Sequence, residues 1–277
     1  MNPAGKVILI TGSTDGMGRM LAGRLAAAGA EVLVHGRDEA RGDAVVDSIC
    51  KAGGRAAFYA ADLSSLAAVR DLAERVLRAH PRLDVLVNNA GIGTGGTDGL
   101  REESVDGHEL RFAVNYLAGF LLTRLLLPRL KESAPARIVN VSSLGQQAID
   151  FNDVMITHDY SGMRAYCQSK LAQILFTMDL AEELAGSGVT ATCLHPAAYM
   201  DTTMVRRSGL TPMSSVEEGC EAVLHLVTTE DTEAVSGRFY NGLRPGRPDP
   251  QAFDTTARNR LRALSERLVG DFVSELQ

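Results

Sequence analysis

Short apolar runs alternate with helix-patterned segments along most of this chain, and that alternation limits the folds open to it. The first run, Val7–Ile10, is wholly apolar, which is typical of a strand buried on both faces of a parallel sheet. Later runs of strand length lie at 31–35, 56–60, 83–87, 137–141, 189–194 and 237–240. This order predicts the α/β class, with a single doubly wound parallel sheet flanked by helices on both faces.

The spacing of the segments also predicts a single domain over residues 1–277. Long helices are expected at 110–130 and 166–185, and no linker divides the chain before residue 243. Residues 243–250 hold three prolines and are expected to form a surface linker. Residues 253–276 are expected to form a packed C-terminal helix, because one stripe carries Leu261, Leu264, Leu268 and Phe272.

Charge and cysteine usage exclude several classes of protein. A formal net charge of −6 argues against a nucleic-acid partner. The four cysteines are widely spread without a CxxC pair, so neither a disulfide framework nor a metal site is expected. The N-terminal region has no apolar run of signal-peptide or membrane-spanning length, so we expect a cytoplasmic protein without a membrane partner.

A glycine-rich segment, residues 11–18, joins the first predicted strand to the first predicted helix. Gly12 allows a tight turn, Gly16 allows backbone to approach a pyrophosphate, and Gly18 allows close helix–strand packing. The N–H groups that begin the helix can bind phosphate. We therefore predict a nucleotide-binding loop, the alternative being a turn that only packs, with contacts from Gly12, Ser13, Thr14, Asp15, Gly16, Met17 and Gly18.

Two charged residues follow the next two strands at the same predicted edge. Arg37 stands where an acidic residue would hold the 2′-hydroxyl of NAD, and an arginine there can pair with the 2′-phosphate of NADP. The alternative is a solvated surface arginine. Asp62, with Leu63 beside it, follows the third strand and could accept a hydrogen bond from an adenine amine, unless it only starts the next helix.

Tyr166 and Lys170 lie four residues apart in a helical pattern, so they share one helix face near its start. A nearby ammonium lowers the pKa of a phenol, and a phenol so tuned can transfer a proton near neutral pH. Most pairs at this spacing are only a solvated helix face. The pair therefore needs support from the rest of the chain.

That support comes from five motifs that occur in one order along the chain. They are residues 11–18, Asn88–Gly91, Asn115, Ser142–Ser143 and Tyr166–Lys170. Together they resemble the compact branch of the short-chain dehydrogenase/reductases, over residues 5 to about 242 with further likeness in the last helix. Segments 137–143, 165–172 and 262–268 are similar to retinol-dehydrogenase-like and WW-domain-oxidoreductase-like members. The resemblance implies a Rossmann-like fold.

The resemblance also implies a catalytic tetrad, Asn115, Ser143, Tyr166 and Lys170. Tyr166 would be the general acid in reduction and the base in oxidation, while Lys170 would lower its pKa and hold the nicotinamide ribose. Ser143, chosen over Ser142 by its motif position, would bind the substrate oxygen. Asn115 would hold a water that passes protons to Lys170, the alternative being a core amide that bends the helix.

Further cofactor contacts are implied at the ends of the fourth and sixth strands. The groove would be lined by Asn88, Asn89, Ala90 and Gly91, although 89–91 could be only a turn. Pro196 and Thr202 or Thr203 would flank the nicotinamide amide. The chain departs from the family pattern here, since Ala197 replaces the usual glycine and the threonine comes one place late.

Residues 199–216 correspond to the substrate loop of the family, and we expect a mobile lid there. Its methionines suit a pocket that closes around a bulky apolar ligand, the alternative being a surface helix with core methionines. The long segment between Ser143 and Tyr166 is expected to complete the substrate wall with Phe151, Met155, His158 and Tyr160, although His158 is more simply a loop histidine.

The sequence thus predicts an NADP(H)-dependent oxidoreductase that interconverts a carbonyl and an alcohol on a bulky apolar or aromatic small molecule. The alternative is a regulatory protein that binds NADP(H) without turnover. The tetrad argues against it, because a protein that only binds has no need of Ser143 and Tyr166 together. A homo-oligomer remains open.

Overall fold

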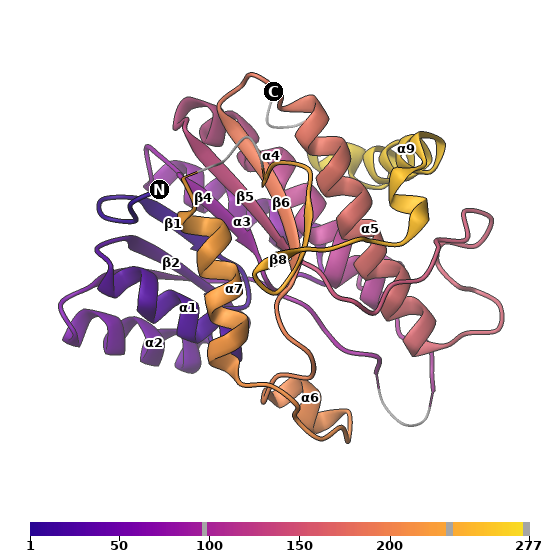
Figure 1. The fold of residues 1–277 in the computed structure, drawn as a ribbon, viewed down its shortest axis with the longest axis horizontal. Helices are drawn as coiled ribbons and strands as arrows, with labels where there is room; N and C mark the ends of the chain where they lie inside the picture. Colours follow the sequence, from indigo (N-terminus) through magenta and orange to yellow (C-terminus); the bar gives the residue numbers. More distant parts are fainter. Residues whose placement is uncertain (96–98, 231–234, 274–277) are drawn as a thin grey trace.

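The strands of the described residues form one sheet of the order β3-β2-β1-β4-β5-β6-β7-β8 (Figure 1). The structure, a computed structural model, describes residues 1–95, 99–230 and 235–273. Every strand pair is parallel except the last, β7 with β8. The strands are β1 Val7–Ile10, β2 Glu31–Gly36, β3 Arg55–Ala60, β4 Val85–Asn88, β5 Ala136–Val141, β6 Val189–His195, β7 Phe239–Asn241 and β8 Arg244–Pro245.

Helices cover both faces of this sheet, so the predicted doubly wound α/β fold is confirmed. The helices are α1 Gly16–Ala27, α2 Glu39–Lys51, α3 Leu66–Ala79, η1 Phe112–Leu117, α4 Ala118–Glu132, α5 Gly162–Glu183, α6 Thr203–Arg207, α7 Val216–Thr228, η2 Pro250–Phe253 and α9 Thr255–Val273. Among the described helices, none is long and apolar enough to span a membrane.

The alternation of side chains along the buried strands creates two cores. In β1, Val7 and Leu9 pack with α3, α4, α5 and α9, whereas Ile8 and Ile10 pack with α1, α2 and α7. Since both faces are covered, the central strands read as continuous apolar runs, which is why the sequence revealed them. Their carboxyl ends meet along one edge, where open α/β sheets bind ligands.

Several predicted boundaries need correction. The helix expected from Tyr166 begins at Gly162, because Ser161 caps it by accepting a hydrogen bond from Arg164 N. Tyr166 therefore lies in the second turn of α5 rather than at its start. Residues 243–250 are not only a linker, since Arg244–Pro245 forms β8. In the C-terminal segment α9 follows a 3₁₀ turn, and residues 274–276 lie outside the described residues.

Candidate active site

Ser143 and Tyr166 lie together beyond the carboxyl end of β5, where the Ser143 hydroxyl is close enough to the phenol to lower its pKa. Ser143 Oγ also accepts a hydrogen bond from Gly145 N at 3.0 Å. A methyl group added to Gly145 would lie 3.4 Å from Tyr166 Cε1, so this glycine packs closely against the phenol. Ser142 faces elsewhere and donates to the backbone oxygen of Lys170 at 2.7 Å.

Lys170 is buried one turn after Tyr166, with its ammonium 5.8 Å from the phenol ring centroid. The ammonium donates to Val141 O at 3.0 Å and to Gln173 Oε1 at 3.1 Å. Burial lowers the pKa of Lys170 to about 8. Burial also raises the pKa of Tyr166, and the Ser143 hydroxyl does not cancel this effect. The expected lowering of the phenol pKa by Lys170 is therefore absent, since desolvation dominates both groups.

Asn115 is buried in η1, a short π-helix that leads directly into α4. Its Oδ1 accepts from Ile92 N at 2.7 Å, and its Nδ2 donates to Ile92 O at 3.2 Å and to Ser169 Oγ at 3.0 Å. A methyl group at Gly91 would lie 3.3 Å from Asn115 Oδ1 and 3.4 Å from Lys170 Nζ. A glycine at 91 thus leaves room between two members of the tetrad. Short π-helices frequently occur at functional sites.

The glycine-rich loop passes over the carboxyl end of β1 and enters α1. Gly12 has a φ of +65°, and a Cβ there would lie 2.9 Å from Ala90 Cα. A Cβ at Gly18 would meet Gly12 O at 2.3 Å. Asp15 caps α1 by accepting from Gly16 N at 2.7 Å. These close approaches explain the glycines by packing, while the free N–H groups of the helix start remain suited to an anion.

Two of the predicted loop contacts face the interior. The Ser13 hydroxyl is buried and donates to Ile10 O at 2.7 Å, and Met17 packs in the core. Only backbone atoms of these residues are therefore placed for a ligand. Thr14 is partly exposed.

His35, which the sequence analysis did not single out, supports the loop from below. Its Nδ1 accepts from Gly12 N at 3.0 Å. Burial lowers the pKa of His35 to about 4, so the ring is neutral at physiological pH. The sequence signal that could have identified His35 is a histidine near the end of a mostly apolar strand.

Arg37 extends from the end of β2 into solvent and makes no hydrogen bond or ion pair with the described part of the chain. Its neighbour Arg41 is engaged, with ion pairs of 3.5 Å to Asp38 and 3.9 Å to Asp15. Arg37 is thus the freer of the two arginines for an added phosphate. Asp62 is exposed after β3 and accepts from Ser64 N at 3.0 Å.

Asp62 does not cap the following helix, because Ser65 does so by accepting from Ala68 N. Leu63 is buried, so its side chain belongs to the core. Asp62 remains at the edge of the sheet where an adenine contact was predicted, on the side of Arg37.

Asn88 is the last residue of β4, and its side chain has different neighbours from those of the residues that follow it. Asn89 donates to Thr11 O at 2.8 Å and Gly12 O at 3.0 Å, and Ala90 N donates to Thr11 Oγ1, so both lie against the glycine loop. Asn88 instead donates to Asn140 and Thr123 in the interior. The side chain of Asn88 is therefore buried among interior polar groups and does not line the groove as predicted.

The segment after β6 returns over the glycine loop. Pro196 is buried, and Thr202 caps α6 by accepting from Val205 N. A methyl group at Gly16 would lie 3.3 Å from Thr202 Cγ2. The next residue, Thr203, donates to Asp15 Oδ2 at 2.7 Å. This short helix therefore rests directly on the predicted nucleotide loop.

Most of the expected substrate wall is committed elsewhere. Tyr160 donates to Glu109 at 3.0 Å, and Arg260 stacks 4.8 Å from the centroid of Phe151. Met155 packs against the core, and the His158 side chain is 85% exposed. Met200 is partly buried and packs against the core beside Met17 and Gly219. The partners of Tyr160 and Phe151, Glu109 and Arg260, come from other parts of the chain, and a substrate wall built from this segment stays a prediction.

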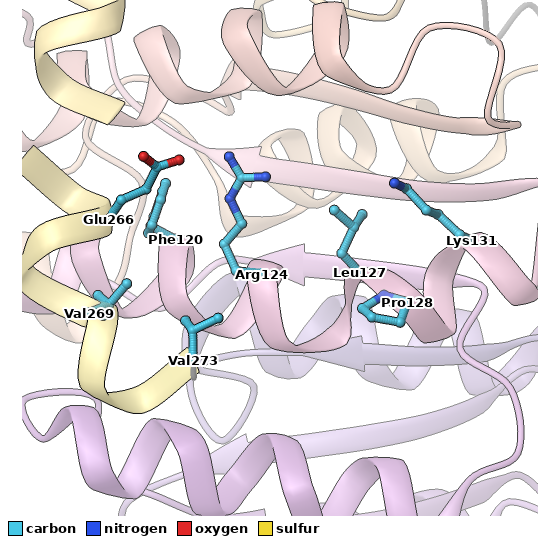
Figure 2. Close-up of a pocket in the computed structure, with 9 residues that line it drawn as sticks. Phe120, Arg124, Leu127, Pro128, Lys131, Glu266, Val269 and Val273 are labelled. Carbon is cyan, nitrogen blue, oxygen red and sulfur yellow. The ribbon is translucent and has the colours of Figure 1, made fainter. Parts of the chain in front are cut away.

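A groove of about 600 Å³ lies between α4 and α9, away from this site (Figure 2). Arg124 and Lys131 of α4 line it together with Val269 and Val273 of α9. None of the predicted site residues contributes to it. The groove therefore does not mark the chemistry suggested by Tyr166.

Comparison with known proteins places this arrangement among relatives. A family model described as short chain dehydrogenase matches residues 6–212. The human protein named retinol dehydrogenase 13 is 37% identical over 96% of this chain and 85% of its own. The structure resembles a protein of Mycobacterium paratuberculosis, at 30% identity, a TM-score of 0.79, and coverage of 96% of this chain and 94% of the other.

A second solved structure of the same kind carries a nucleotide. It is described as a short chain dehydrogenase from Burkholderia cenocepacia in complex with NADP. The two chains are 30% identical, with a TM-score of 0.70 and coverage of 87% of this chain and 97% of that one.

Proposed function

Because the chain belongs to the short chain dehydrogenase family, a family of oxidoreductases, we propose that it is an NADP(H)-dependent enzyme that interconverts a carbonyl and an alcohol. The observation that carries the proposal is the meeting of Ser143, Tyr166 and Lys170 at the carboxyl edge of the sheet. Their chemistry, a hydroxyl donor, a phenol and a buried cation, suits proton transfer to a carbonyl oxygen.

Each member of the tetrad has a role in this reaction. Ser143 donates a hydrogen bond to the substrate oxygen, and Tyr166 gives that oxygen its proton in reduction and takes it back in oxidation. Lys170 supplies positive charge near the phenolate that reduction leaves behind. Asn115 holds Ile92, and with it the loop beside Lys170.

The residues of the sheet edge fit a nicotinamide dinucleotide. When bound, NADP(H) supplies or accepts the hydride. The start of α1 offers N–H groups to its pyrophosphate, and Arg37, which has no partner among the described residues, offers its guanidinium to the 2′-phosphate. The solved relative in complex with NADP supports this choice of nucleotide.

The substrate is proposed to be bulky and apolar or aromatic. The segment 199–216 supports this, because four of its large apolar side chains are exposed beside the site: Tyr199, Met204, Leu210 and Met213. Tyr199 lies near enough to Tyr166 to affect its pKa. Such side chains suit a ligand that they can cover. The relatives named retinol dehydrogenases point the same way.

The test is NADPH oxidation with a panel of carbonyl compounds, from small hydrophilic aldehydes to bulky aromatic ketones. We expect turnover to favour the bulky apolar members. The variant Tyr166→Phe keeps the ring and removes the proton, so NADPH affinity should persist while turnover falls by about a hundredfold or more. A wild-type protein that binds NADPH but oxidises it with no carbonyl would favour the regulatory alternative.

A further inference from the structure

Arg111 is the most deeply buried guanidinium near the tetrad, with a relative exposure of 1%. Its Nε donates to Gly93 O at 3.3 Å, its Nη1 to Tyr160 Oη at 3.1 Å, and its Nη2 to Glu102 Oε2 at 2.5 Å. Glu109 is fully buried beside it, with Oε1 3.5 Å from Arg111 Nη1. A buried cation with this many directed partners has little freedom to move.

Arg111 and Asn115 form hydrogen bonds with consecutive residues of one loop. They lie one helical turn apart, and Asn115 bonds both backbone groups of Ile92 while Arg111 bonds Gly93 O. A Cβ at Gly95 would lie 2.1 Å from Arg111 Nη2, so the loop passes directly over the guanidinium. Segment 92–95 follows Gly91, the glycine beside Lys170.

The same cluster reaches the helix that carries Tyr166. Tyr160 bonds Arg111 and Glu109, and the next residue, Ser161, caps α5. A Cβ at Gly162 would lie 1.8 Å from Thr94 O, so the first turn of α5 presses on the loop from the other side. Glu109 Oε2 meanwhile accepts from Phe112 N at 2.7 Å, at the start of η1.

We propose that Arg111 is a positioning residue, which fixes segment 92–95 between η1 and α5 and so holds Asn115 in register with Tyr166 and Lys170. This inference rests on the proposed function for its effect on turnover. It predicts that the nucleotide-binding loop at β1 is unaffected, because the partners of Arg111 among the described residues are Gly93, Tyr160, Glu102 and Glu109, none of which belongs to 11–18. The expected defect is therefore in turnover rather than in affinity for NADPH.

The decisive variants are Arg111→Met, which removes the guanidinium, and Tyr160→Phe, which removes one hydroxyl and keeps the ring. Arg124→Met is the matched control, since Arg124 of α4 also pairs with a carboxylate, Glu183, but lies in the groove away from the site. Each protein is assayed for kcat, for KM for NADPH, and for hydrogen exchange in peptides covering 89–95.

We expect Arg111→Met to lower kcat by about tenfold or more with KM for NADPH within about twofold. Exchange at 89–95 should rise by about tenfold. Tyr160→Phe should show the same pattern at about a third of the size, and it decides the matter if Arg111→Met does not fold. Arg124→Met should match wild type in both readouts.

Unchanged exchange at 89–95 in folded Arg111→Met and Tyr160→Phe would overturn the positioning role, even if turnover fell. Equal losses in Arg124→Met would do the same, because they would reveal a general loss of stability. A wild-type protein without carbonyl reductase activity would instead refute the proposed function, while the exchange data would still decide whether Arg111 holds the loop.

Discussion

Lys170 is a buried cation that, within the described residues, is bonded by a carbonyl and an amide oxygen but by no carboxylate. Burial therefore lowers its pKa from 10.5 to about 8. The unfolded chain holds the proton up to pH 10.5, so between pH 8 and 10.5 it binds more protons than the folded protein. The burial of Lys170 therefore destabilises the folded protein by its full amount below pH 8, and this destabilisation disappears as the pH rises to 10.5.

The variant Lys170→Met, which has no ammonium, tests how much the burial of this charge destabilises the fold. A difference of about 2.5 pH units corresponds to about 3 kcal/mol. We expect the unfolding free energy of wild type, measured relative to that of Lys170→Met, to increase by about this amount as the pH rises from 8 to 10.5. Urea denaturation at a series of pH values measures it, and parallel curves for the two proteins would show that Lys170 keeps its ordinary pKa.

Arg37 should set the choice between NADPH and NADH. Arg37→Asp replaces a free guanidinium with a carboxylate that repels a 2′-phosphate, so preference should move toward NADH by about tenfold or more. The measurement is the ratio of kcat/KM for the two nucleotides. If this ratio stays constant, Arg41 is the next arginine to replace, since it lies one turn into α2.

At the scale of elements, α9 is joined to η1 by one buried hydrogen bond. Ser265 Oγ donates to Leu261 O at 2.8 Å, so it accepts from the phenol of Tyr116, 2.7 Å away. Burial raises the pKa of Tyr116, which keeps the phenol protonated as a donor. Tyr116 is the residue after Asn115, so the C-terminal helix supports the part of η1 that carries this predicted catalytic residue.

A double-mutant cycle measures this support. Ser265→Ala strands a buried hydroxyl and should cost about 1–3 kcal/mol of unfolding free energy. Adding Tyr116→Phe removes the stranded group, so the double variant should be little less stable than Tyr116→Phe alone. Additive losses in chemical denaturation would mean that the two side chains do not interact.

The segment 199–216 should behave as a lid. It contains only one short helix, and its exposed apolar side chains gain partners only when something lies beneath them. Hydrogen exchange over 199–216 should therefore be fast in the free protein and slow with nucleotide and substrate together. Equal exchange in both conditions would assign these residues to a fixed surface.

For the molecule as a whole, the sequence was sufficient wherever a feature depends on local pattern. Val7–Ile10 and the glycines after it needed only burial and turn geometry to be recognised. The ionic cluster of Arg111 and Glu109 could not be found in this way, since charged residues are usually exposed and their partners come from 102, 93 and 160.

Other errors have similar causes. Asn88 and Asn89 are the same residue type, and the sequence does not reveal that the first bonds Asn140 in the interior while the second bonds Thr11 O at the glycine loop. The pKa of Tyr166 depends on how much protein surrounds it, which spacing along a helix does not reveal. The contacts of Tyr160 with Arg111 and of Phe151 with Arg260 could not be predicted either, because these partners lie far away in sequence.

Under the proposed function, the hydrogen bond from Thr203 to Asp15 should slow the release of the nucleotide. Since α6 rests on Gly16, we expect a nucleotide bound at this loop to leave only after Thr203 and Asp15 have separated. Release of the oxidised nucleotide would then be slower than the chemical step and would limit turnover. When enzyme, NADPH and substrate are mixed rapidly, the first equivalent of oxidised nucleotide should form in a burst. Thr203→Val should raise the steady-state rate that follows the burst.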